Sequence, residues 1–136
     1  MTISIDDNFL ILCKQAYELD LSTDDWGEVE YSMVDLLKLV RSNPDQRDLF
    51  IRLFTEIYHG IHQVPEYLMA FCMRELRYAE IRSLYVNECA GDQNTAQFRR
   101  RMNHISHVMH AFDDEVWEDA DMWSYYAHEL REGGAE

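Results

Sequence analysis

Helix-breaking residues are scarce in this chain. Only two of its 136 residues are proline and five are glycine. Pro44 and Pro65 both lie where a helix could begin, since proline has no N–H to lose at the first helical position. No segment alternates apolar and polar residues as a half-buried strand does, and no Asn-Gly or Asp-Gly hairpin turn occurs. These absences predict an all-α fold.

Motifs of nucleophilic, redox and phosphate chemistry are also missing. Cys13, Cys72 and Cys89 are widely spaced and form no Cys-x-x-Cys pair, so we expect buried, reduced thiols. The sequence has no Gly-x-Ser-x-Gly elbow and no glycine-rich loop that could hold a phosphate. We therefore expect no catalytic residue and no cofactor.

Positive charge is the third scarcity. The chain has 12 Lys and Arg against 26 Asp and Glu, a formal net charge of -14. Nucleic acids and anionic membranes are bound through cations, so neither is an expected partner. The one basic cluster, Arg99–Arg101, is expected to pair with nearby acids. No apolar run approaches the roughly 20 residues of a membrane span, and no signal peptide is recognisable. The sequence predicts a soluble cytoplasmic protein.

Apolar residues recur at helical spacing along most of the chain. A helix is predicted over residues 9–19, capped by Asp6 or Asp7, and a second one follows a cap at Ser22 or Thr23. The second helix would bury an apolar stripe that comprises Trp26, Val29, Met33, Leu36, Leu37 and Val40.

The sequence NPDQ, residues 43–46, marks the start of a third helix. Asn43 can cap it and Gln46 can reach back to complete a capping box. Its apolar face would extend to Ile61, and Gly60 would end it. Further helices are expected after Pro65, between a break at Arg77–Tyr78 and Gly91, from Asn94, and around Trp117 or Trp123.

Six or seven helices joined by short loops predict a bundle or an irregular helical array. No linker divides the chain, so we expect a single domain over residues 1–136 with a frayed C-terminal tail from about residue 132.

Histidines offer the candidate metal site. Glu56 and His59 have the Glu-x-x-His spacing of di-iron helical bundles, with His62 one turn further, but the second copy that such sites need is missing. A metal-dependent helical enzyme that uses this cluster is kept as an alternative function.

A second histidine group lies on the helix from Asn94. If Phe98, Met102, Ile105, Met109 and Phe112 face the core, a rotation of about 100° per residue places His104, His107 and His110 on the water side. His107, His110 and Asp114 could then form an exposed metal site. The favoured interpretation is that these histidines are solvated and that the chain binds no metal.

Two acidic stretches contain aromatic residues. The stretch "DDEVWEDADMW", residues 113–123, has six carboxylates and two tryptophans, and residues 20–31 contain five acids together with Trp26 and Tyr31. Protein interfaces use aromatic anchors for affinity and charges for steering, so we predict a surface that binds a basic protein. In the alternative interpretation the tryptophans belong to the core and the acids solvate helix starts. The expected partner-binding residues are Asp113, Asp114, Glu115, Trp117, Glu118, Asp119, Asp121, Trp123, Tyr125, Tyr126, Asp24 and Asp25.

A small, acidic, all-helical chain that carries "DDEVWEDADMWSYY" resembles the immunity proteins of bacterial toxin systems, of the contact-dependent growth inhibition and nuclease-colicin kinds. The resemblance lies in size, charge and aromatic content. It implies a non-enzymatic inhibitor that binds a basic toxin domain, such as a nuclease, and covers its active site or an adjacent exosite. Helical DNA mimics that block nucleic-acid enzymes share these features. A structural or adaptor subunit, with self-association through the aromatic face, is a further alternative.

Overall fold

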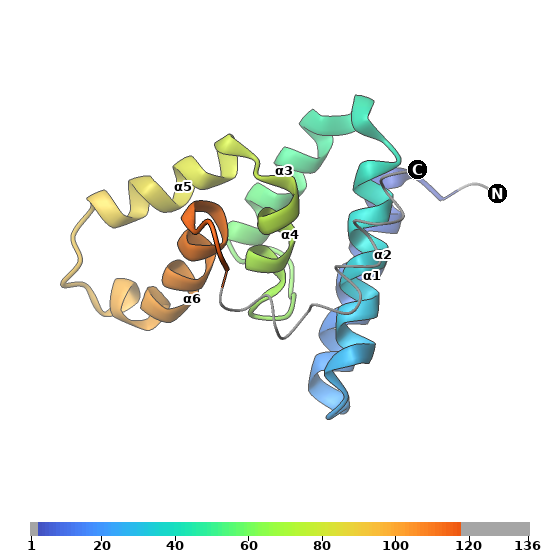
Figure 1. Cartoon of the computed structure of the whole chain (residues 1–136), viewed down its shortest axis with the longest axis horizontal. Helices are drawn as coiled ribbons and strands as arrows, with labels where there is room; N and C mark the ends of the chain where they lie inside the picture. Colours follow the sequence, from blue (N-terminus) through green and yellow to red (C-terminus); the bar gives the residue numbers. More distant parts are fainter. Residues whose placement is uncertain (1–2, 118–136) are drawn as a thin grey trace. The chain divides into compact units, whose positions relative to one another are not determined.

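The computed structural model describes residues 3–117 (Figure 1). Within this range the chain forms six α-helices and one turn of 3₁₀ helix, and no strand occurs among these residues. The predicted all-α fold is confirmed. The described residues form two compact units, residues 3–65 and residues 66–117. The single domain over residues 1–136 stays a prediction, and the tail from about residue 132 lies outside the described residues.

The first unit begins with two helices that lie side by side (Figure 1), α1 (Ile5–Ser22) and α2 (Trp26–Arg41). The Ser4 hydroxyl caps α1 by accepting a hydrogen bond from the Asp7 amide at 3.4 Å, so the predicted caps at Asp6 or Asp7 are wrong. Both acids lie in the first turn instead, where the helix dipole favours negative charge.

The cap of α2 also differs from the prediction. The Asp25 carboxylate accepts a hydrogen bond from the Gly27 amide at 2.9 Å, whereas Ser22 is the last residue of α1. Thr23 lies in the connection, where its hydroxyl accepts from the Asp25 amide at 3.1 Å. The stripe predicted for α2 is buried at Val29, Met33, Leu36, Leu37 and Val40.

A 3₁₀ turn, η1 (Pro44–Gln46), precedes α3 (Arg47–Tyr58). The predicted capping box does not form: the Asn43 side-chain amide donates to the Leu39 carbonyl at 2.8 Å, and no side chain caps α3. Gly60 adopts a φ of 78° after the helix, as its predicted role requires. Ile61 is 64% exposed and lies beyond the helix, so it does not extend the apolar face.

Aromatic rings form the core of the first unit. The ring of Phe9, from α1, lies edge-on to that of Phe54 with centroids 5.2 Å apart, and its centroid is 6.0 Å from that of Phe50. All three side chains are fully buried. Edge-to-face pairs of this kind add to the stabilisation that burial itself provides.

The second unit comprises α4 (Leu68–Leu76), α5 (Ala79–Ala90) and α6 (Ala96–Asp113). Arg77 separates α4 from α5 with a left-handed φ of 52°, which confirms the break predicted there. Gly91 ends α5 as predicted. The Thr95 hydroxyl, rather than Asn94, caps α6 by accepting from the Phe98 amide at 3.1 Å.

The buried face of α6 differs from the predicted stripe. Met102 is 53% exposed, whereas Val108 and Ala111 are fully buried beside Ile105 and Phe112. The helix is thus rotated by about one residue relative to the prediction, and His104 lies on its packed side. A histidine can be buried there because both of its ring nitrogens have polar partners, the Tyr85 hydroxyl and the Glu66 carbonyl.

Two further expectations concern cysteines and membranes. Cys13, Cys72 and Cys89 form no disulfide; Cys13 and Cys72 are buried as predicted, whereas Cys89, which was also predicted to be buried, is only half-buried. Burial raises the pKa of the Cys13 thiol to about 12.

Within residues 3–117, no helix combines the length and the apolar character that crossing a membrane requires.

Candidate functional site

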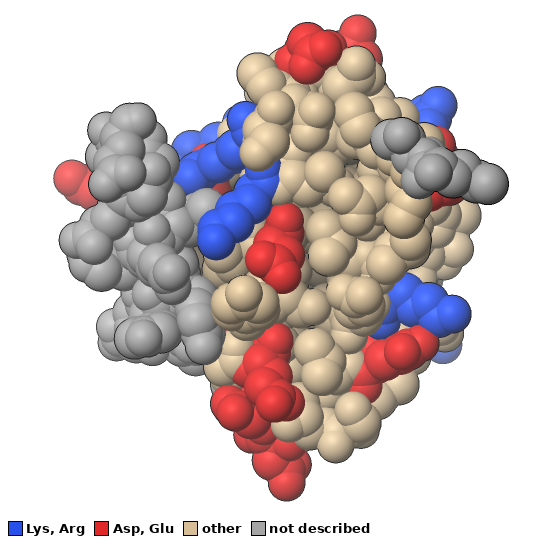
Figure 2. All heavy atoms as spheres, turned by 90° about the vertical axis from the view of Figure 1, so that its right-hand side faces the viewer, with Lys and Arg blue, Asp and Glu red and all other residues tan. Residues whose placement is uncertain are grey.

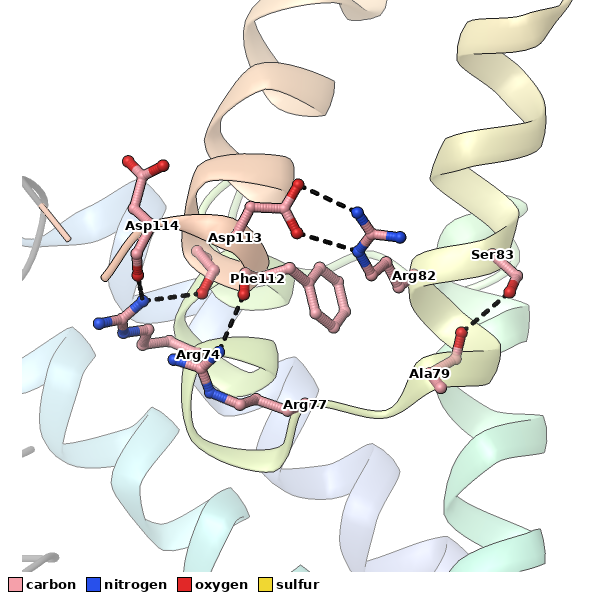
Figure 3. A network of polar contacts seen from close by, with 9 residues as sticks. Arg74, Arg77, Ala79, Arg82, Ser83, Phe112, Asp113 and Asp114 are labelled. Atoms are coloured by element: carbon pink, nitrogen blue, oxygen red, sulfur yellow. Dashed lines mark hydrogen bonds and ion pairs between the residues drawn. The ribbon is translucent and has the colours of Figure 1, made fainter. Parts of the chain in front are cut away.

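The start of the acidic stretch is held by three arginines of the second unit (Figure 3). Arg74 lies near the end of α4, Arg77 follows α4 directly, and Arg82 lies in α5. Their guanidinium groups bind five consecutive residues at the C-terminal end of α6, from Ala111 to Glu115. We call Arg74, Arg77 and Arg82 the arginine clamp.

Two members of the clamp bind backbone carbonyls. Arg74 donates to the carbonyl of Ala111 at 3.1 Å, to that of Asp114, and to that of Glu115 at 3.0 Å. Arg77 donates to the Phe112 carbonyl at 2.9 Å. The last carbonyls of a helix have no partner within the helix and carry its negative dipole end. Two guanidinium groups therefore satisfy and neutralise the end of α6.

The third member forms an ion pair with one of the predicted binding residues. Arg82 Nε and Nη2 donate to the two carboxylate oxygens of Asp113 at 3.0 and 3.1 Å. These hydrogen bonds and the Asp113 charge raise the pKa of Arg82. Both side chains are nearly half exposed, so solvent screens the pair and it adds little to stability. Asp113 is thus engaged within the chain, but by a contact that another cation could replace.

Trp117 is not the exposed anchor that we predicted. Only 7% of it is exposed, and the Arg74 guanidinium carbon lies 5.9 Å from the centre of its ring. Trp117 therefore belongs to the core, as the alternative interpretation of the acidic stretch predicted. The ring is large and apolar, and a guanidinium stacks favourably on such a face.

The residues just before Trp117 have the opposite character. Glu115 is exposed, and 82% of Val116 is exposed, more than any other large apolar side chain described. The Asp114 carboxylate is 3.0 Å from His110 Nδ1. An acid and an apolar side chain thus face solvent together at this point. The other residues predicted for this stretch lie outside the described residues: Glu118, Asp119, Asp121, Trp123, Tyr125 and Tyr126.

The second acidic group lies at the connection between α1 and α2. Asp24 and Asp25 are exposed, as is Glu28 in the first turn of α2. Figure 2 shows acidic side chains gathered at the lower end of one face, at the height of this connection in Figure 1. Leu21, in the last turn of α1, is 69% exposed, and Tyr31 is 53% exposed. The sequence did not indicate Leu21 or Val116 as surface residues.

Two of the histidines in residues 3–117, His62 and His110, each pair with one carboxylate. Glu56 Oε1 lies 2.7 Å from His62 Nε2, whereas His59, the other member of the Glu-x-x-His motif, is exposed. His107 is exposed beside the His110–Asp114 pair. Within residues 3–117, no group of three or more His, Cys, Asp and Glu side chains could hold a metal ion.

His104 occupies a polar site inside the second unit, contrary to the prediction that it faces water. Its Nε2 is 2.8 Å from the hydroxyl of the fully buried Tyr85, and its Nδ1 is 3.2 Å from the Glu66 carbonyl. Burial lowers the pKa of His104, the nearby Glu66 charge opposes that shift, and Arg101 adds to it.

One residue of the basic cluster confirms the predicted pairing with acids. Arg101 Nε and Nη2 donate to the two carboxylate oxygens of Glu88 at 2.7 and 3.1 Å. Both side chains are largely buried between α5 and α6. Arg99 and Arg100 are exposed.

No protein-family model, curated protein or solved structure matches this chain.

Proposed function

We propose that this chain is a non-enzymatic, acidic binding protein that inhibits a basic partner, in the manner of a bacterial immunity protein that blocks a toxin nuclease domain in the cytoplasm. The observation that carries the proposal is a repeated surface pattern. In each unit exposed carboxylates lie within a few residues of a strongly exposed apolar side chain: Asp24 and Glu28 follow Leu21 by three and seven residues, and Glu115 directly precedes Val116.

The charge of the chain supports a basic partner. The acids outnumber the cations by 26 to 12, and many of the cations already have acceptors within the chain. A net negative surface attracts a basic protein and accelerates association, while apolar contacts slow dissociation. The cations with acceptors among the described residues include Lys14, Arg52, Arg74, Arg77, Arg82 and Arg101.

The pattern also favours protein over nucleic acid as the partner. A phosphate backbone would require a cluster of available cations, whereas Arg101 of the basic cluster is bound to Glu88. The exposed apolar side chains would contribute nothing to a purely electrostatic contact, but they fit the apolar centre of a protein interface.

The first test is capture from a lysate of the native cells, with elution by a salt gradient and identification by mass spectrometry. We expect one stoichiometric basic protein, and a nuclease assay with and without this chain then tests inhibition. Self-association of the chain, with no partner retained at low salt, would contradict the proposal and favour a structural subunit.

Charge-reversal variants then locate the contact. Asp24→Lys with Glu28→Lys tests the first unit, and Asp114→Lys with Glu115→Lys and Glu118→Lys tests the acidic stretch. Asp25 is left unchanged because it caps α2. The matched control is Asp45→Lys with Asp48→Lys, two exposed acids around the start of α3. We expect at least one test variant to abolish capture while the control and the helical circular dichroism stay unchanged. Capture that survives both test variants would refute the assignment of the contact to these acids.

A further inference from the structure

Arg74 of the arginine clamp holds the segment that contains Glu115 and Val116, two residues of the proposed binding surface. The inference below rests on that proposed function. Arg74 binds the backbone of Asp114 and Glu115 and lies against Trp117, whereas the side chains of Glu115 and Val116, between these contacts, face solvent. We propose that Arg74 is a positioning residue, which fixes the chain after α6 so that Glu115 and Val116 are presented to the basic partner.

The geometry explains why an arginine is needed. The guanidinium group has five N–H donors in a rigid plane. Arg74 uses two of its nitrogens to reach three carbonyls, and its guanidinium carbon is 5.9 Å from the centre of the Trp117 ring. A lysine presents a point charge on a flexible stem and has no plane to match this arrangement. The backbone of residues 114 and 115 is therefore tied to α4 by a single side chain.

Arg82 provides a natural comparison. It has the same charge and lies in the same clamp, but its partner is the exposed side chain of Asp113 rather than the backbone. Loss of Arg82 would free a carboxylate without releasing residues 114–117. The two arginines therefore differ in what they hold, not in charge.

This difference gives opposite expectations for a basic probe. Removal of either arginine lowers the positive charge of the chain by one, which by electrostatics alone strengthens binding of a cationic peptide. If Arg74 positions the contact, Arg74→Met weakens binding despite the favourable change in charge, whereas Arg82→Gln strengthens it. The sign of the effect thus separates positioning from electrostatics.

The binding experiment uses a 16-residue peptide of four Arg-Leu-Leu-Arg repeats and isothermal titration calorimetry at one fixed ionic strength. We expect Kd to rise at least 3-fold for Arg74→Met and for Arg74→Lys, and to fall for Arg82→Gln. Val116→Ser should raise Kd by a similar factor without a change in charge. If Arg74→Met strengthens binding as Arg82→Gln does, or leaves Kd unchanged, the positioning role is refuted.

A distance measurement tests the same role without any ligand. Spin labels are placed on cysteines substituted for Gln97, exposed in the first turn of α6, and for Val116, in a Cys89→Ser background. The native Cys13 and Cys72 are buried. Double electron–electron resonance should give a narrow distribution that broadens for Arg74→Met and Arg74→Lys but not for Arg82→Gln. An unchanged distribution in a variant whose circular dichroism shows a folded chain would overturn the inference.

The two proposals fail in different ways. If no basic protein is captured from the native lysate, the proposed function fails, while the distance distributions still decide whether Arg74 fixes residues 114–117. If a partner is captured but the Arg74 variants bind it and the peptide as the parent does, the function stands and the positioning role falls.

Discussion

The hydrogen bonds of His104 allow a prediction of how protons affect stability. Nδ1 faces the Glu66 carbonyl at 3.2 Å and the Glu66 carboxylate at 3.3 Å, both of which only accept hydrogen bonds. The neutral ring must therefore carry its proton on Nδ1, and Nε2 accepts from the Tyr85 hydroxyl at 2.8 Å. Protonation of Nε2 would turn this acceptor into a donor and force the buried hydroxyl to find a new acceptor.

The perturbation is His104→Phe, which keeps an aromatic ring of similar size but removes both nitrogens. Tyr85 is fully buried, so loss of the hydrogen bond between its hydroxyl and His104 would cost about 1–3 kcal/mol of unfolding free energy. Tyr85→Phe alone would leave a ring nitrogen unsatisfied. The double variant removes both polar groups, so its cost should be smaller than the sum of the two single costs by about 1 kcal/mol.

Urea unfolding of the four proteins, followed by circular dichroism at pH 7.5, measures this coupling. A coupling energy within about 0.3 kcal/mol of zero, which is the usual error of additivity, would refute the assigned hydrogen bond. Unfolding curves of the parent and His104→Phe must have the same denaturant slope for the comparison to hold.

The same residue gives a pH dependence of defined sign. Burial lowers the pKa of His104 below its unfolded value of 6.5, while the charges of Glu66 and Glu88 raise it and that of Arg101 lowers it. The unfolded chain therefore binds the proton more readily than the folded chain. His104 contributes stability above pH 6.5 that is lost as the pH falls from 6.5 through the folded pKa. The loss of stability of the parent between pH 7.5 and 5.5 should thus exceed that of His104→Phe, and equal losses in the two proteins would contradict this account.

Three further predictions concern the first unit and the cysteines. Phe9→Ala should lower the unfolding free energy by about 3–5 kcal/mol in urea titration, because the ring is fully buried; a loss below 1 kcal/mol would contradict its central place. Gly60→Ala should cost about 1–2 kcal/mol on the same assay because φ is 78°, although no atom lies within 4 Å of the added carbon; an unchanged midpoint would show that the backbone relaxes. Ellman's reagent should modify half-buried Cys89 first, and Cys13, whose pKa burial raises to about 12, only on unfolding; a fast phase that survives Cys89→Ser would be inconsistent with this order.

Helices and their breaks were predictable because they depend on neighbouring residues. The breaks at Arg77 and Gly91 follow from the interrupted apolar spacing there and from the low helix propensity of glycine. Caps were predicted less well, since Ser4 and Asp25 took the roles assigned to nearby residues. Several polar residues compete to cap each helix start, and their intrinsic preferences are similar.

The buried face of α6 could not be derived from local periodicity. Stripes that contain Met102 or Val108 fit a helix almost equally well, and the tertiary partners of His104 selected the second. The burial of Trp117 could not be derived from its neighbours either. The acids around it suggest that the ring is exposed, but in the folded chain the ring is buried and lies near the Arg74 guanidinium. Of the residues predicted to bind the partner, Asp24, Asp25, Asp113 and Glu115 are exposed in the described part of the chain, and Asp113 is paired with Arg82.

The sequence by itself determined the all-α fold, the charge of -14 and the positions of the main helix breaks, because composition and spacing within a few residues decide them. Only the tertiary structure decided that Arg74, Arg77 and Arg82 hold the end of α6, through hydrogen bonds to residues 31 to 41 positions away. It also decided that Val116 rather than Trp117 faces solvent. Pairs so distant in sequence meet only when packing brings their helices together, and no local pattern records that packing.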